Sequence, residues 1–186
     1  MKKDTETPPG YLRVTEVLQP FSTLGDIDPQ TLANAADRGT RVHAYCEAHA
    51  LGLFVEEYAD DCKNYVECFK KWFDEMVVNV LHAEVRLNSP TYRISGACDL
   101  MVILKGDTCA TLVDIKTPAS AQMSWQLQTA AYQLLSEEVL HIRPERRICL
   151  MLPKTGDRVT IKEYMDHDRD QELYIKALEL YRFFKV

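Results

Sequence analysis

Two carboxylates and an ammonium, Asp99, Asp114 and Lys116, flank two short apolar runs that are rich in β-branched residues, 100–104 and 108–115. A Lys-Gly-Asp turn joins the runs, which predicts an antiparallel β-hairpin. The hairpin would bring the two aspartates to the same end of the paired strands. Because strand side chains alternate between faces, Asp114 and Lys116 should point the same way.

The chemistry that this end of the hairpin could carry is metal-assisted phosphoryl chemistry. Ile115 should bury its side chain in the core and leave its carbonyl between the carboxylates of Asp99 and Asp114. Carboxylate and carbonyl oxygens are hard ligands, the kind that Mg²⁺ and Mn²⁺ take together with a phosphate and water. The Lys116 ammonium could orient or deprotonate an attacking water, or stabilise charge that develops on the phosphate. Alternatively, the two aspartates and the lysine are ordinary solvated residues at the ends of a hairpin.

Two further candidates lie on the elements that must surround this hairpin. His43 follows Gly39 within a helix that the apolar spacing predicts over residues 30–52. Gly39 in mid-helix suggests the close approach of another backbone or a local break. Glu84 lies on a strand expected over residues 81–87. A lone histidine on an amphipathic helix is usually a surface or core residue, and Glu84 could be the polar side of its strand.

Gln128 and Tyr132 are one helical turn apart, so they share a face of the helix that follows the hairpin. We expect Ser120 or Ser124 to cap this helix, which runs to about residue 140. An amide and a phenol beside a metal site could bind phosphate or stack a base, whereas a core position is the alternative for Tyr132. The other predicted elements are a helix over 14–18 capped by Thr15, a helix over 55–80, a hairpin over 148–152 and 158–164, and a final helix over 168–184.

Composition indicates an ordinary globular protein, and the predicted helices and strands, with no repeat or linker among them, indicate a single α/β domain over residues 1–186, of which 1–10 are expected to be disordered. The chain has 46% hydrophobic and 27% charged residues and a net charge of −6. No apolar run is long enough for a membrane span, and the first residues do not form a signal peptide, so a cytoplasmic protein is expected. The acidic charge argues mildly against a bare polyanion as partner, although a basic strip can exist on an acidic protein.

The six cysteines are scattered along the chain, with neither a Cys-x-x-Cys pair nor the Cys and His spacing of a zinc or iron–sulfur site. We therefore interpret them as reduced and mostly as packing residues.

The order in which the candidate site residues follow one another along the chain indicates a protein family. His43, Glu84, a Gly-x-x-Asp99 motif, Asp114-Ile-Lys116 and Gln128-x-x-x-Tyr132 follow one another in a pattern that resembles the PD-(D/E)XK nuclease superfamily. Within it, the Gly-Thr-x-x-His match of residues 39–43 resembles the RecB-like branch, which includes phage-type exonucleases. The resemblance covers about residues 38–133. It implies a restriction-endonuclease-like core, a mixed central β-sheet flanked by helices on both faces, with the 30–52 helix laid across the end of the hairpin.

The resemblance also implies roles for individual residues. His43, Asp99, Asp114 and the Ile115 carbonyl would bind Mg²⁺ or Mn²⁺, and Lys116 would be the catalytic lysine. A histidine ligand favours Mn²⁺. The other roles that we carry over are a second metal or a basic group for Glu84, and contacts with DNA for Gln128, Tyr132, Trp125, Arg38 and Arg41. Relatives with an iron–sulfur cluster use clustered cysteines, and this chain has none after Cys149, so no such cluster is expected.

The resulting hypothesis is a metal-dependent deoxyribonuclease, acting as an exonuclease on single- or double-stranded DNA ends in phage-type recombination, repair or replication. The cytosol of a bacterium or a phage-infected host is the expected location, with no membrane partner. Two other classes are considered: a catalytically silent module that binds nucleic acid or protein, and a metal hydrolase of small phosphoesters. The sequence leaves open whether the chain forms a homo-oligomer or joins a recombination or replication partner protein.

Overall fold

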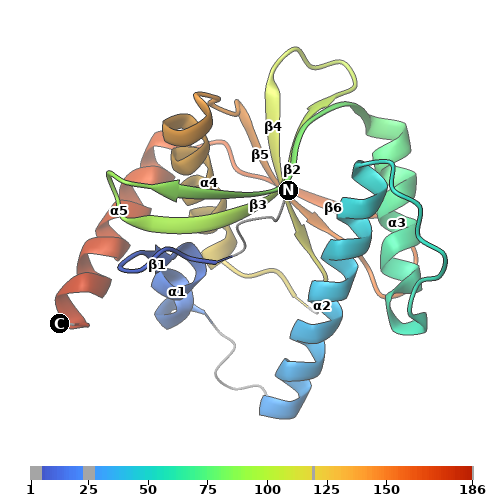
Figure 1. The fold of residues 1–186 in the computed structure, drawn as a ribbon, viewed down its shortest axis with the longest axis horizontal. Helices are drawn as coiled ribbons and strands as arrows, with labels where there is room; N and C mark the ends of the chain where they lie inside the picture. Colours follow the sequence, from blue (N-terminus) through green and yellow to red (C-terminus); the bar gives the residue numbers. More distant parts are fainter. Residues whose placement is uncertain (1–5, 23–27, 119, 186) are drawn as a thin grey trace.

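A mixed six-stranded sheet forms the centre of the computed structural model, which describes residues 6–22, 28–118 and 120–185 (Figure 1). The strands are β1 Leu12–Arg13, β2 Val77–Ser89, β3 Ile94–Leu104, β4 Ala110–Lys116, β5 Arg146–Met151 and β6 Thr160–Glu163. The helices are α1 Val14–Leu18, α2 Pro29–Ala50, α3 Asp60–Met76, α4 Ser124–Leu140 and α5 His167–Phe184, and a short 3₁₀ turn, η1, covers Gln19–Phe21.

Helices cover both faces of this sheet, as predicted. In Figure 1, α2 and α3 lie on one side of it, and α1, α4 and α5 lie on the other. Each side has its own apolar core: Val42, Phe69 and Ile115 belong to the first, and Leu135 and Tyr174 belong to the second. The two cores enclose the sheet in a three-layer α/β arrangement. The predicted fold class is therefore confirmed.

The edge of β3 that faces β4 pairs with other strands only near the two ends of β3. Strand β2 pairs antiparallel with the opposite edge of β3 over nearly its whole length. On the near edge, Ile94 and Ser95 pair in parallel with β1, and residues 100–103 pair antiparallel with β4. Within the described residues, 96–99 have no partner strand there. This open stretch of β3 is where the chain can place side chains between strands.

Strand β4 continues beyond β3 by pairing in parallel with β5, to which α4 connects it. Strand β6 then pairs antiparallel with β5, which confirms the second predicted hairpin. A parallel pair needs a crossover connection, and α4 supplies it on the face opposite α2. The helix that carries Gln128 and Tyr132 is thereby brought over the C-terminal end of β4.

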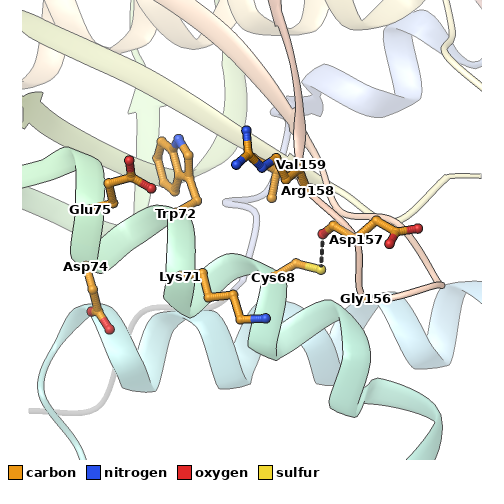
Figure 2. Close-up of a pocket in the computed structure, with 9 residues that line it drawn as sticks. All are labelled: Cys68, Lys71, Trp72, Asp74, Glu75, Gly156, Asp157, Arg158 and Val159. Carbon is orange, nitrogen blue, oxygen red and sulfur yellow. Dashed lines mark hydrogen bonds between the residues drawn. The ribbon is translucent and has the colours of Figure 1, made fainter.

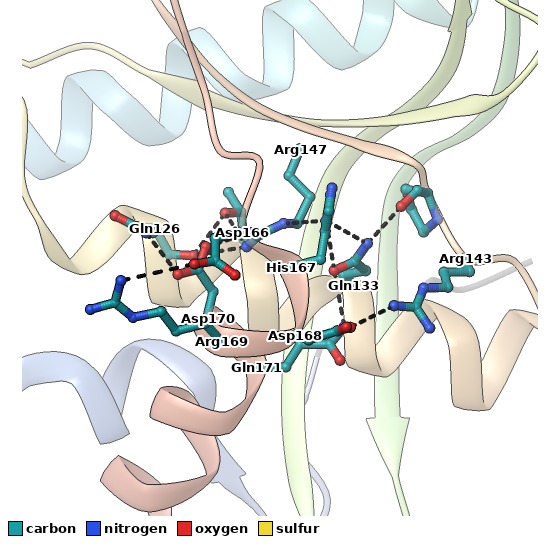
Figure 3. Close-up of polar contacts among 12 residues, drawn as sticks. Gln126, Gln133, Arg143, Arg147, Asp166, His167, Asp168, Arg169, Asp170 and Gln171 are labelled. Carbon is teal, nitrogen blue, oxygen red and sulfur yellow. Dashed lines mark hydrogen bonds and ion pairs between the residues drawn. The ribbon is translucent and has the colours of Figure 1, made fainter.

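A buried polar network joins β5, α4 and α5 (Figure 3). The guanidinium of Arg147 is fully buried and forms a 2.5 Å ion pair with the equally buried carboxylate of Asp170. Arg147 also donates to the Gln126 carbonyl oxygen at 3.2 Å and to His167 Nδ1 at 3.0 Å, and Gln126 Nε2 donates to Asp170 at 2.7 Å. Because each partner is hydrogen-bonded, the pair can remain charged in the interior.

Several predicted boundaries were wrong. The helix expected over 55–80 is α3 and ends at Met76, because the β-branched run from Val77 continues directly into β2. Thr15 does not cap α1, since it lies inside the helix and Arg13 occupies the cap position. Neither serine proposed for α4 caps it, because Met123 precedes the helix without a side-chain hydrogen bond.

The expected disorder of residues 1–10 falls partly on 1–5, which lie outside the described residues. Immediately afterwards, the Tyr11 N–H donates to the Pro8 carbonyl at 3.1 Å, so this part of the segment forms a turn. Among the described helices, none is long and apolar enough to cross a membrane.

Candidate metal centre and active site

The candidate site lies at the fork where β4 separates from β3. The ladder between these strands ends with Leu100 opposite Val113, so the next backbone donor of β4 that faces β3 has no strand partner. Asp99 replaces that partner: its Oδ2 accepts the Ile115 N–H at 2.6 Å. In an extended strand the N–H and C=O of one residue face the same edge, so the Ile115 carbonyl also faces the fork. The side chain of Ile115 is buried in the core beneath α2 and α3.

Helix α2 brings His43 to this fork. Its Nδ1 lies 3.0 Å from Oδ1 of Asp99 and 3.8 Å from Oε1 of Glu84. One ligand atom from each of these three residues falls within 4.8 Å of the others. Val42 and Cys46 pack in the core on either side of His43, which fixes the rotation of the helix about its axis. The structure thus brings together an imidazole and two carboxylates from three separate elements.

Glu84 reaches the cluster through an unusual backbone conformation. Its φ is +46°, in the left-handed region that residues with a side chain rarely adopt within a strand. The neighbouring pairs of the ladder, Ala83 with Leu100 and Val85 with Cys98, place Glu84 opposite Asp99. Such strain persists only where the surrounding structure holds it, and it concentrates at functional sites.

Asp114 and Lys116 point to the same side of β4, as their spacing predicts, and form an ion pair of 2.7 Å. This side is the one covered by α4, from which Gln128 accepts a hydrogen bond from Lys116 Nζ at 3.0 Å. The Gln128 amide nitrogen donates to the Tyr132 hydroxyl at 2.9 Å and lies 3.5 Å from Oδ1 of Asp114. Gln128 therefore joins the lysine, the aspartate and the tyrosine in one buried network.

The position of Tyr132 depends on Gly96. A Cβ added to this glycine would lie 2.6 Å from Cε1 of Tyr132 and 3.0 Å from Cδ1 of Leu135. Real Cβ atoms do not approach that closely, so the tyrosine ring rests on the bare backbone of β3. The glycine of the Gly-x-x-Asp99 motif and the tyrosine of the Gln128-x-x-x-Tyr132 motif are thus parts of one packing contact.

The charges of the cluster shift the pKa values of its members. Burial alone would lower the pKa of His43, but the carboxylates of Asp99 and Glu84 raise it to about 10. Burial would raise the pKa of Asp99, whereas the charge of His43 lowers it. A pKa this far above neutral favours the imidazolium form of His43, whose single positive charge offsets part of the negative charge of the two carboxylates.

In the neighbouring pair, the pKa values of both Lys116 and Asp114 are raised. Burial would lower the pKa of Lys116, but the charges of Asp114 and Asp99 raise it above its usual value. Burial, reinforced by the charge of Asp99, raises the pKa of Asp114 despite the nearby ammonium. Lys116 is consequently held as a cation, which suits charge stabilisation and the orientation of water better than the removal of a proton.

The residues expected to contact DNA lie in different surroundings. Trp125, Gln128 and Tyr132 are only 8%, 9% and 5% exposed, so the two rings have no free face on which a base could stack. Trp125 and Gln128 contact Lys116, Gln128 also approaches Asp114, and Tyr132 accepts a hydrogen bond from Gln128. Arg41 is held by Asp61 through two hydrogen bonds, of 2.7 and 2.8 Å, so its guanidinium is already engaged.

Arg38 lies on the same side of α2 as Arg41, and its guanidinium stacks over the Tyr65 ring at 5.6 Å. Within the described residues its Nε has no hydrogen-bond partner. Among the described residues, no backbone atom outside α2 lies near the mid-helix Gly39, since the nearest atom to an added Cβ is Oγ1 of Thr117 at 3.6 Å. That distance is ordinary van der Waals contact, and α2 continues through Gly39, so neither the close backbone approach nor the local break that we expected is found there.

A cleft of about 810 Å³ lies elsewhere, between α3 and the segment that leads into β6 (Figure 2). Its lining residues are Cys68, Lys71, Trp72, Asp74, Glu75, Gly156, Asp157, Arg158 and Val159. Its wall is closed by Cys68, whose thiol donates to the Asp157 carbonyl at 2.8 Å. None of the residues of the fork lines this cleft, so it is not the enclosed small-molecule pocket that a phosphoester hydrolase would place at its site.

One member of the site was missed by the sequence analysis. Cys149 lies opposite Asp114 in the β4–β5 ladder and directs its thiol to Oδ2 of that residue at 3.4 Å. Burial raises the pKa of the Cys149 thiol, so the sulfur keeps its proton and donates to the carboxylate. Only the register of two parallel strands places them together, and spacing in the sequence carries no signal of it.

Comparison with protein families shows the family to which the chain belongs. The family model of the PD-(D/E)XK nuclease superfamily matches residues 13–180. The chain belongs to this superfamily, which confirms the resemblance seen in its motifs and makes it a member of a nuclease family. No curated protein sequence matches it.

Solved structures with a similar arrangement share little sequence with the chain. The structure of SSO0001 aligns with a TM-score of 0.47 at 15% identity, over 95% of this chain and 79% of that one. An alkaline exonuclease from Laribacter hongkongensis, LHK-Exo, aligns with a TM-score of 0.42 at 12% identity, over 95% and 92% of the two chains. Its complex with dAMP aligns with a TM-score of 0.39 at 14% identity, over the same shares. Because these scores lie below 0.5, the family assignment rests on the family model.

Proposed function

We propose that the chain is a divalent-metal-dependent deoxyribonuclease that hydrolyses phosphodiester bonds from DNA ends. The observation that carries this proposal is the meeting of His43, Glu84 and Asp99 at the fork, with ligand atoms within 4.8 Å of one another. The Asp114–Lys116 ion pair of 2.7 Å adjoins them on the neighbouring strand. An acidic cluster that can hold a divalent cation and a fixed ammonium together can supply the Lewis acidity and the charge stabilisation that favour phosphodiester hydrolysis.

The donor set fits a hard divalent cation. One imidazole nitrogen and two carboxylates supply nitrogen and oxygen ligands, which suit Mn²⁺ and Mg²⁺, and the set contains no thiolate that would select zinc. We assign His43 and Asp99 as ligands, with Glu84, Asp114 and the Ile115 carbonyl completing the set. A bound divalent cation supplies Lewis acidity to the scissile phosphate and lowers the pKa of a coordinated water.

Each of the protein's own residues at the site has a separate role in the proposed reaction. Asp99 fixes the open end of β4 through the Ile115 N–H and presents its other oxygen, Oδ1, to His43. The Lys116 ammonium orients the attacking water and stabilises the negative charge that builds on the phosphate. Gln128 holds that ammonium in place, and Tyr132 holds Gln128. This assigns positioning roles to Gln128 and Tyr132 in place of direct contacts with DNA.

We assign DNA contact to Arg38 and leave Arg41 a structural role. Arg38 uses the face of Tyr65 for support, whereas both oxygens of Asp61 already occupy Arg41. Among the described residues, no carboxylate pairs with the Arg38 guanidinium, which leaves it available to a phosphate. A role in recombination, repair or replication of the phage type remains part of this proposal.

The test is the degradation of end-labelled linear single- and double-stranded DNA and of a closed circle, with Mg²⁺, Mn²⁺ or EDTA. We expect cleavage of linear DNA with either cation, no cleavage in EDTA, and a spared circle. Lys116→Ala should abolish cleavage, whereas Lys71→Ala, which removes a lysine from the distant cleft, should not. A wild-type chain that leaves every substrate intact yet shifts DNA in a gel would establish the binding module instead, and nicking of the circle would establish an endonuclease.

A further inference from the structure

The catalytic ammonium proposed above has a third neighbour besides its two polar partners. Lys116 Nζ lies 5.5 Å from the centroid of the Trp125 ring, within the range of a cation–π contact. Trp125 is one turn before Gln128 on α4, so the two side chains approach the lysine from the same helix. The ring is 8% exposed, which makes this contact a desolvated one.

The geometry around the ammonium limits where it can point. A lysine ammonium has three N–H donors. Asp114 Oδ2 accepts at 2.7 Å and Gln128 Oε1 accepts at 3.0 Å. The indole covers a further side and keeps water from it. One donor is left for an attacking water or a phosphate oxygen, and its direction is set by the other contacts.

The Trp125 ring is itself fixed from behind. It packs in a small cluster with Cys149 and Tyr164, and Met151 packs against that cluster. Cys149 is the residue whose thiol donates to Asp114. The same cluster therefore supports both members of the Asp114–Lys116 pair, the carboxylate through the thiol and the ammonium through the indole.

We propose that Trp125 is a positioning residue that holds the Lys116 ammonium in its reactive orientation through its π face. This inference rests on the proposed nuclease function, because it assigns Trp125 a purpose in that reaction. It replaces the role of a base-stacking platform, which the burial of the ring disfavours.

Trp125→Leu and Trp125→Phe separate this role from simple packing. Leucine fills part of the space without a π face, whereas phenylalanine keeps a smaller one. On end-labelled linear DNA with Mn²⁺, we expect Trp125→Leu to lower kcat about tenfold with little change in KM, and Trp125→Phe to retain most of kcat. Trp72→Leu is the matched control, because it removes the chain's other tryptophan, also buried, from α3.

A second measurement does not depend on activity. Lys116→Ala, Trp125→Leu and the double variant form a cycle in which urea unfolding reports the coupling of the two side chains. We expect the effects on the unfolding equilibrium constant to be non-additive by about threefold to tenfold.

The outcomes distinguish the two proposals. In a chain that cleaves DNA, an additive cycle, or a kcat of Trp125→Leu equal to that of Trp72→Leu, would overturn the role of Trp125 alone. A kcat loss in Trp125→Leu that Trp125→Phe does not restore would also overturn it. A wild-type chain that cleaves no DNA would overturn the nuclease proposal, whereas a non-additive cycle in that chain would still establish the contact.

Discussion

Gly96 and Tyr132 are in direct contact across β3 and α4: a Cβ on the glycine would lie 2.6 Å from the tyrosine ring. Through Gln128, which bonds both the Tyr132 hydroxyl and Lys116, this contact extends to the candidate catalytic lysine. The backbone of one motif therefore sets the position of a side chain in another. This relationship explains in physical terms why a glycine precedes Asp99 by three residues.

Gly96→Ala should destabilise the protein by about 1–3 kcal/mol, the usual cost of overpacking a core, because Tyr132 and Leu135 must both move. Gly39→Ala is the matched control. It adds the same methyl group to a helix, where the nearest atom is 3.6 Å away, so it should stabilise the protein by about 0.5–1 kcal/mol. Urea unfolding of both variants measures these effects, and equal shifts of the same sign would contradict the contact.

Gln128→Leu should lower kcat about 10- to 100-fold while KM changes little, because the side chain positions Lys116 and does not reach the substrate. Tyr132→Phe keeps the ring against Gly96 and removes only the hydroxyl that accepts from Gln128, so its loss should be smaller. Steady-state cleavage of end-labelled DNA gives both parameters. An increase in KM at unchanged kcat would instead indicate that Gln128 contacts DNA.

Much of the fold could be predicted from the sequence because short-range signals specify it. Alternating and β-branched runs with a Lys-Gly-Asp turn mark the central hairpin, and apolar spacing marks α2 and α5. The end of α3 was misplaced because Met76, Val77 and Val80 continue the helical spacing of apolar residues while the backbone has already become a strand. The strand begins at Val77 because this residue pairs with Leu104 on β3, a contact that the local sequence does not reveal.

The site was predictable to the extent that residue type and order reveal it. Asp99, Asp114 and Lys116 could be found because the hairpin turn relates them in the sequence. The contact of Glu84 with His43 depends on the distorted backbone at Glu84. The contact of Cys149 with Asp114 depends on the register of the parallel strands β4 and β5. Only the folded sheet defines these two features. The burial of Trp125 and Tyr132 likewise follows from how α4 packs on the sheet.

His43 should make stability and metal affinity depend on pH in opposite ways. Its pKa is about 10 in the fold against 6.5 for an ordinary histidine. The stability that its charge contributes is therefore complete below about pH 6.5 and is lost as the pH rises toward 10. A cation must displace this proton, so metal affinity should rise over the same range.

The measurement is urea unfolding in EDTA between pH 6 and pH 9, together with Mn²⁺ titration at each pH. We expect His43→Gln to flatten the pH dependence of the free energy of unfolding and to weaken Mn²⁺ binding. Wild-type and variant curves that run parallel would show that His43 is not an imidazolium in the metal-free fold.

The Arg41–Asp61 pair should contribute to stability only above acidic pH. Arg41 lowers the pKa of Asp61 from 3.8 to about 2. The contribution is present above about pH 4 and is lost as the pH falls toward 2. Both groups are solvent-exposed, so the effect is modest. Acid titration followed by circular dichroism should show a weaker pH dependence in Asp61→Asn than in the matched Asp60→Asn, and an equal change in both would exclude the pair.

Asp170→Asn should be among the most destabilising single changes, by about 3–5 kcal/mol, because it leaves the fully buried guanidinium of Arg147 without its countercharge. Asp170 lies on α5, which packs on α4, and α4 carries Gln128. An effect of this change on the candidate active site would therefore act through a shift of α4. Asp168→Asn is the matched control, since Asp168 pairs with Arg143 at the surface and its side chain is 90% exposed. That control should cost less than about 1 kcal/mol. Thermal and urea unfolding compare the two, and a small loss in Asp170→Asn would mean that neutral acceptors, including Gln126, Thr129 and His167, can satisfy the buried arginine.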